Sequence, residues 1–153
     1  MNAQVQTATD LFMDLDAAPQ PAAPSVSPSN KRVWAGRIIS TLPVLFMLFD
    51  SGIKLFNAAP VAEAFDRMGF SPSLAVSLGI LSLFCTVLYA IPRTSVLGAV
   101  LLTGYLGGAV CSHVRIADPM FSHTLFPVYV ATLFWLGLYL REPRLSSLFP
   151  FRS

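Results

Sequence analysis

The sequence predicts an all-α fold: an integral membrane four-helix bundle with a short interfacial amphipathic helix between the first and second helices. The first observation behind this prediction is composition. Hydrophobic residues make up 54% of the 153 positions and charged residues 12%, which is about half the charged share of a soluble domain. The second is that four apolar stretches follow Lys31-Arg32. These stretches lack the alternation of strands, and an open sheet leaves its backbone unsatisfied in lipid, so we expect helices.

The chain is expected to divide into three parts. Residues 1–30 are rich in Ala, Pro, Ser and Gln. Such a segment buries too little apolar surface to offset its ordering entropy, so we expect a disordered cytoplasmic tail. Residues 31–145 form the predicted transmembrane domain, and residues 146–153 a short cytoplasmic tail.

The four predicted transmembrane helices cover about 33–56, 72–91, 95–114 and 124–140. Each is close to the roughly 20 residues that cross a hydrocarbon layer as a helix. Ser71-Pro72 is typical of an N-cap followed by a first helical residue, and it is expected to open the second helix. Pro92 closes that helix, and Glu142-Pro143 ends the fourth.

Residues 60–68 predict a short amphipathic helix between the first two spans. Apolar side chains share one of its faces, and these are Val61, Ala64, Phe65 and Met68. Gly69 follows as a C-terminal stop. This pattern is typical of a helix lying on the membrane surface. Whether residues 60–68 act as a lid is left open by the sequence.

The basic residues predict the orientation. Seven fall on one side of the predicted membrane and three on the other: Lys31, Arg32, Arg37, Arg93, Arg141, Arg144 and Arg152 against Lys54, Arg67 and Arg115. By the positive-inside rule both termini are cytoplasmic. We expect a multi-pass protein of the bacterial inner membrane, with lipid as its surroundings.

Several classes of function are excluded or left without a motif. The net charge is +2 and the basic residues form no stripe, which excludes a nucleic-acid-binding protein. There is no phosphate loop, dinucleotide fingerprint or nucleophile elbow, so no catalytic residue is assigned and enzymatic activity stays undecided. The two His residues lack metal-ligand spacing, so no metal is predicted.

Ionisable residues of two spans are predicted to lie at one level. At 1.5 Å per residue, Asp50 lies about 26 Å along the first span and His113 about 27 Å along the third. Asp50 and Lys54 have the i, i+4 spacing of a helical ion pair. One interpretation is a polar pocket that binds a ligand or relays protons, because intramembrane charges are candidates for function. The other is a stabilising pair whose Lys54 snorkels to the interface, with His113 capping its helix.

Small residues mark one face of the third span. Gly104 and Gly108 are four residues apart, and Gly107 lies beside them. Such spacing lets helices pack closely. Packing within the bundle is favoured over dimerisation, although a homo-oligomer stays open.

Two short motifs carry a family resemblance. The first span ends Asp50-Ser51-Gly52-Ile53-Lys54, and the third ends Gly107-Gly108-Ala109-Val110-Cys111-Ser112-His113. In this order the chain resembles the DoxX-like family of four-helix membrane proteins over about residues 38–141. The family is named for the membrane subunit of a thiosulfate:quinone oxidoreductase. The resemblance implies Asp50, Lys54 and His113 as polar positions, and Gly52, Gly107 and Gly108 as packing positions.

Two hypotheses of function remain open. In the first, the chain is a subunit or accessory factor of a membrane redox system, and it binds a quinone-like ligand between Asp50, Lys54 and His113. It has no intrinsic cofactor, so a redox enzyme is the expected partner. In the second, it is a non-catalytic scaffold, assembly factor or small-solute carrier. A cofactor-free isomerase acting on a lipid-soluble substrate ranks below both.

Overall fold

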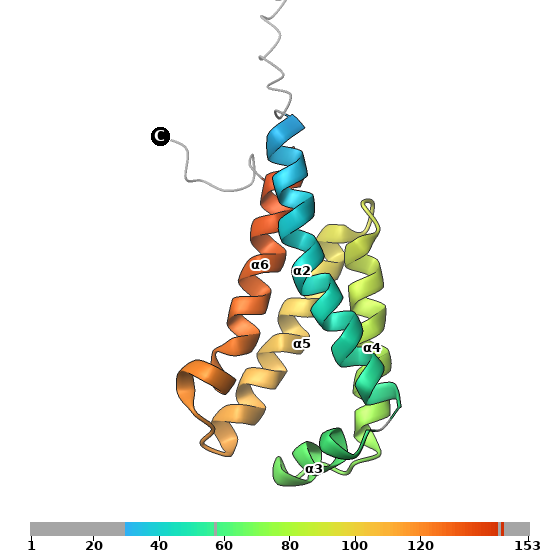
Figure 1. Ribbon diagram of the computed structural model, residues 1–153, viewed down its shortest axis with the longest axis vertical. Helices are drawn as coiled ribbons and strands as arrows, with labels where there is room; N and C mark the ends of the chain where they lie inside the picture. The colour runs from blue at the N-terminus through green and yellow to red at the C-terminus, as the bar shows by residue number, and fades with distance from the viewer. Residues whose placement is uncertain (1–29, 57, 144, 146–153) are drawn as a thin grey trace, which may run out of the picture.

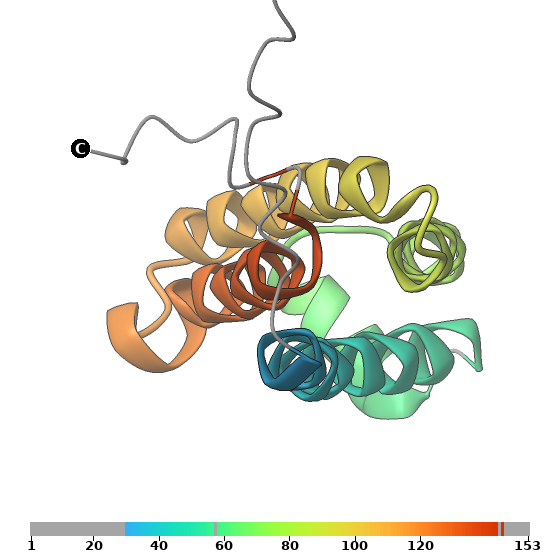
Figure 2. The same cartoon turned by 90° about the horizontal axis from the view of Figure 1, so that it is seen from above.

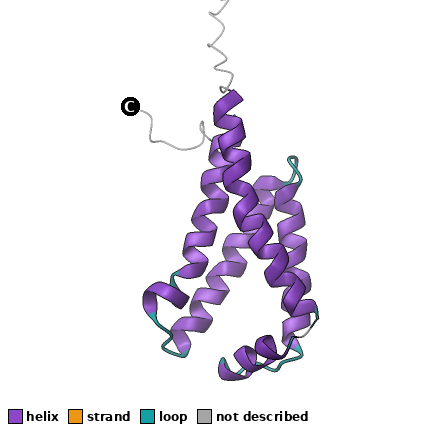
Figure 3. Ribbon diagram, in the orientation of Figure 1, coloured by secondary structure: helices purple, strands orange, loops and turns teal. Residues whose placement is uncertain are grey.

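The computed structural model describes residues 30–56, 58–143 and 145. The described residues form helices joined by short loops, and no strand occurs among them (Figure 3). The expected tails, at residues 1–29 and 146–153, lie outside them. The elements are α2 (Asn30–Leu55), α3 (Ala59–Arg67), α4 (Leu74–Ala90), α5 (Ser95–Arg115), the π-helical turn η1 (Met120–Thr124) and α6 (Phe126–Arg141).

The predicted start of the second helix at Ser71-Pro72 is wrong. Helix α4 begins at Leu74, and Ser73 occupies the N-cap position without a side-chain capping bond. The hydroxyl of Ser71 instead lies 2.8 Å from that of Ser73. The two hydroxyls bond each other and neither caps the helix. Helix α4 therefore begins directly after the Ser-Pro-Ser segment. The last span also differs from its prediction, because η1 precedes α6.

Three segments are long and apolar enough to cross a membrane: α2, α5, and the run from η1 through α6. Helix α4 is also apolar but has only 17 residues. The side chains on the outside of the helices are largely apolar; Phe49 is 67% exposed and Ile38 66% exposed. An apolar surface of this extent is typical of a face that contacts lipid.

Each long helix packs against two others. Helices α4 and α6 both contact α2, and both also contact α5 (Figures 1 and 2). The start of α2 and the end of α6 lie at one end of the molecule, and α3 lies across the other end (Figure 1). This arrangement encloses the central side chains between the four long helices and leaves α3 as a cover at one end.

Close approach between the helices depends on four glycines, which are Gly36, Gly79, Gly98 and Gly137. A Cβ added to Gly36 of α2 would lie 2.8 Å from the carbonyl oxygen of Gly137 in α6. A Cβ at Gly79 of α4 would lie 2.9 Å from the Lys54 Cβ, and one at Gly98 of α5 would overlap the backbone of Tyr89. The missing side chains therefore allow the backbones to approach each other, as small residues do in membrane helices.

The centre of the packing contains a polar cluster as well as apolar side chains. The hydroxyl of Tyr89 is fully buried; it donates to the carbonyl of Phe134 at 2.8 Å and lies 2.9 Å from the Ser40 hydroxyl. Because the phenol proton goes to Phe134, Ser40 donates to Tyr89. These bonds connect α2, α4 and α6 and satisfy polar atoms that would be costly to bury alone.

Candidate functional site

A cavity of about 800 Å³ lies between α2, α4 and α5, and α3 forms one of its walls. Viewed along the long axis, α3 crosses beneath the space between α2 and α5 (Figure 2). Most of the lining is apolar, from residues such as Phe65, Met68 and Leu78. A concave apolar cavity with a few polar groups is the usual form of a small-molecule site, and here the polar groups come from α2 and α5.

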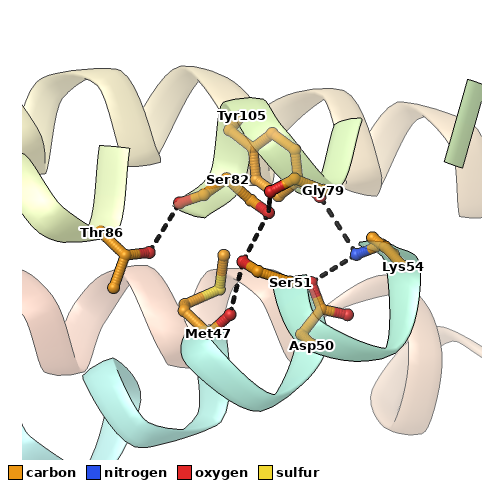
Figure 4. Close-up of polar contacts among 8 residues, drawn as sticks. All are labelled: Met47, Asp50, Ser51, Lys54, Gly79, Ser82, Thr86 and Tyr105. Atoms are coloured by element: carbon orange, nitrogen blue, oxygen red, sulfur yellow. Dashed lines mark hydrogen bonds and ion pairs between the residues drawn. The ribbon is translucent and has the colours of Figure 1, made fainter. Parts of the chain in front are cut away.

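The first polar group joins Asp50 and Lys54 of α2 to Tyr105 of α5 (Figure 4). The Lys54 ammonium forms an ion pair with the Asp50 carboxylate and donates to the Tyr105 hydroxyl at 3.1 Å. An ammonium group has three N–H donors, so these contacts leave one for a ligand. The Tyr105 hydroxyl accepts from Lys54, which leaves its own proton to donate. At this end of the cavity, Lys54 and Tyr105 can therefore donate hydrogen bonds.

A hydroxyl pair lies beside this group and holds α2 against α4. Ser51 is fully buried, donates to the Met47 carbonyl at 2.7 Å and lies 2.8 Å from the Ser82 hydroxyl (Figure 4). The pair fixes the turn of α2 that presents Asp50 and Lys54 to the cavity.

The second polar group is His113, which also lines the cavity. Its Nδ1 lies 2.6 Å from a carboxylate oxygen of Asp118, and both side chains are partly buried. The His123 ring is edge-on to it, with centroids 6.2 Å apart. Asp118 lies beyond the end of α5 and reaches His113 because the chain reverses at Ala117, whose φ is 54°.

Arg115 fastens α3 to the end of α5. Its guanidinium donates to the carbonyl of Met68, at the C-terminal end of α3, and lies 5.3 Å from the centroid of the Phe70 ring. A cation at a helix C-terminus is favoured by the helix dipole. Phe65 in turn packs against Phe70, with ring centroids 6.2 Å apart. These contacts hold α3 over the cavity.

The expected packing role of four glycines differs from what the structure shows. A Cβ at Gly52, Gly104, Gly107 or Gly108 would meet no described atom within 4 Å. Gly104 and Gly108 line the cavity instead. Both lie on one face of α5, and within the described chain that face borders the cavity. The close helix contacts are made by other glycines.

All three predicted polar residues border the same cavity, and two further residues were missed. Asp50, Lys54 and His113 are among its lining residues. Tyr105 could have been found from His113, because it lies eight residues earlier and thus on the same helix face. Asp118 had no comparable signal. Among the residues that the structure describes, no group of three or more His, Cys, Asp or Glu side chains has the geometry to hold a metal ion.

The apolar helices define a multi-pass integral membrane protein. Comparison with known families gives the more particular assignment. The model of the DoxX-like family matches residues 38–137, which is most of the chain and includes all of its polar cavity residues from Asp50 to His113. The chain belongs to the DoxX-like family. No curated protein and no solved structure matches it.

Proposed function

We propose that the chain is a four-helix transmembrane bundle in which α4 is the fourth span and α3 lies at the outer membrane surface. Helix α4 packs between α2 and α5, and its 17 residues extend about 25 Å. Helix α3 buries Val61 and Phe65 and exposes Glu63, Asp66 and Arg67, as an interfacial helix does. The distribution of basic residues supports cytoplasmic termini, and the bacterial inner membrane is the location we propose.

The function that the geometry supports best is binding of a quinone-like ligand within a membrane redox system, as a subunit or accessory factor. The observation that carries it is the apolar cavity with a cationic donor at Lys54 and an imidazole at His113. A lipid-soluble ring with polar oxygens fits such walls and such partners. Electron transfer itself belongs to a partner enzyme, since the ligand site supplies binding and orientation.

The proposed contacts follow from the donors that are left over. Lys54 has one N–H beyond its bonds to Asp50 and Tyr105, and it would donate to a ring oxygen. Asp50 balances the ammonium charge, so that the site is close to neutral before a neutral ring enters. The open face at Gly104 and Gly108 leaves room for the ring against the α5 backbone.

The test is purification of the full chain in native-lipid nanodiscs, with bound small molecules identified by mass spectrometry. Gly108→Leu fills the cavity, whereas Gly107→Leu adds the same side chain to the same helix outside the cavity lining. We expect a quinone with the wild type and with Gly107→Leu, and at least a tenfold loss with Gly108→Leu. The double variant Asp50→Asn with Lys54→Gln removes the cation without leaving a lone carboxylate, and it should lose the quinone as well.

The opposite result favours the other hypothesis. If all of these samples contain only the same bulk lipid, and each retains the near-ultraviolet circular dichroism of the folded protein, the quinone proposal is refuted. A scaffold, assembly factor or small-solute carrier would then be the better explanation, and the search would turn to protein partners.

A further inference from the structure

The pair formed by His113 and Asp118 has a defined direction of hydrogen bonding. A carboxylate has no proton to donate, so the bond of 2.6 Å between Asp118 and Nδ1 requires the proton on Nδ1. In the neutral ring the second nitrogen, Nε2, then carries a lone pair and accepts hydrogen bonds. His113 lines the cavity, and Nε2 is the ring nitrogen that the bond to Asp118 leaves for a ligand there.

The position of Asp118 is built by an unusual helix end. The amide of Asp118 donates to the carbonyl of His113 and that of Ala117 donates to Val114, both at 3.1 Å. These two hydrogen bonds form the pattern of a Schellman motif, in which glycine usually occupies the left-handed position. Here Ala117 occupies it, with φ of 54°. The reversal returns the next residue, Asp118, toward the His113 ring.

The two ends of the cavity therefore differ in what they offer a ligand. Lys54 and Tyr105 present donors, which bind the oxygen of either a carbonyl or a hydroxyl group. An accepting Nε2 binds only a group that carries a proton. His113 lies eight residues beyond Tyr105, about 12 Å along α5, so the two requirements apply at separate places in the cavity.

We propose that Asp118 is a positioning residue that holds His113 as the hydrogen-bond acceptor of this cavity, so that the site selects hydroxyl-bearing rings, hydroquinones above quinones. The inference rests on the proposed ligand site and names its substrate class. Asp118→Asn removes the constraint, because an amide can either donate to Nδ1 or accept from it. The imidazole can then adopt either tautomer, so that Nε2 either accepts a hydrogen bond from the ligand or donates one to it.

The experiment measures the binding of two probes, decylubiquinol and decylubiquinone, to the full chain in quinone-free phosphatidylcholine nanodiscs at pH 8.5. Empty nanodiscs correct for partition into lipid. We expect the wild type to bind the quinol about tenfold more tightly than the quinone, the factor that one misplaced buried hydrogen bond carries. In Asp118→Asn the ratio should fall to within about twofold of one. Asp66→Asn, a matched change at an exposed carboxylate of α3, should keep the wild-type ratio.

Two outcomes overturn the inference in distinguishable ways. If the wild type and Asp118→Asn bind both probes with the same ratio, Asp118 has only a structural role while the quinone site stands. If the wild type binds neither probe, the ligand site and the inference fail together.

A second measurement does not depend on the folding of Asp118→Asn. The chain has two histidines, so His123→Gln leaves His113 as the only imidazole in an ¹⁵N-histidine NMR spectrum. The signature of an Nδ1–H, Nε2-accepting ring supports the inference, and the Nε2–H form overturns it.

Discussion

Substitution of two glycines of α5 by alanine should have unequal effects on stability. A Cβ at Gly98 would overlap the backbone of Tyr89 and lie 2.8 Å from the carbonyl carbon of Leu88, whereas a Cβ at Gly107 meets no described atom within 4 Å. Both changes gain about 1 kcal/mol of helix propensity. Only Gly98→Ala adds the cost of overpacking, about 1–3 kcal/mol, because a backbone cannot rotate away as a side chain can.

The propensity gain is common to both variants, so their difference isolates the overpacking. We expect Gly98→Ala to be less stable than Gly107→Ala by about 1–3 kcal/mol. The free energy of unfolding would be measured by titration with sodium dodecyl sulfate in mixed micelles, followed by near-ultraviolet circular dichroism. Equal free energies of unfolding for the two variants, with neither less stable than the wild type, would refute the packing described here. Equal destabilisation of both would instead show that the Gly107 face is covered, as in a homo-oligomer.

Two further predictions concern the polar contacts. Tyr89→Phe removes the hydroxyl that bonds to α2 and α6 and should lower the free energy of unfolding by about 1 kcal/mol in the same titration. Its control is Thr132→Val, which removes a hydroxyl bonded within α6 and should lower the free energy of unfolding by less than half as much. Arg115→Ala releases the end of α3 and should raise hydrogen–deuterium exchange in residues 59–70 several-fold, while Arg93→Ala leaves it unchanged; equal exchange in both would show that Arg115 does not hold α3.

The apolar helices were predictable because length and composition decide them. A run of about 20 apolar residues can satisfy its backbone in lipid only as a helix, and α5 accordingly begins at Ser95 as predicted and extends one residue further. Helix ends were less predictable. At Ser71-Pro72 the Ser71 hydroxyl bonds that of Ser73 and does not cap the helix, and the structure starts the helix at Leu74.

The membership of the candidate site was predictable in part, but the arrangement of its residues was not. Rise per residue predicted one common level for Asp50, Lys54 and His113, and all three do line one cavity. However, Lys54 bonds Tyr105, which lies eight residues before His113 on α5, so the calculation did not fix their relative positions along the cavity. It gave no information on lateral neighbours, so Tyr105, the partner of Lys54, was missed. Asp118 depends on a left-handed alanine, and no sequence pattern predicts that conformation for a residue other than glycine or asparagine.

The glycines of α5 show that spacing along a helix does not by itself define the role of a residue. Gly98, Gly104 and Gly108 all lie on α5 and all lack a side chain, but the neighbour decides the consequence. Opposite Gly98 stands the backbone of α4, and the missing side chain brings two helices together. Opposite Gly104 and Gly108 stands the cavity, and the missing side chains enlarge it. A glycine repeat with the spacing of a helix-packing motif therefore contributes here to the cavity between the donor at Lys54 and the imidazole of His113.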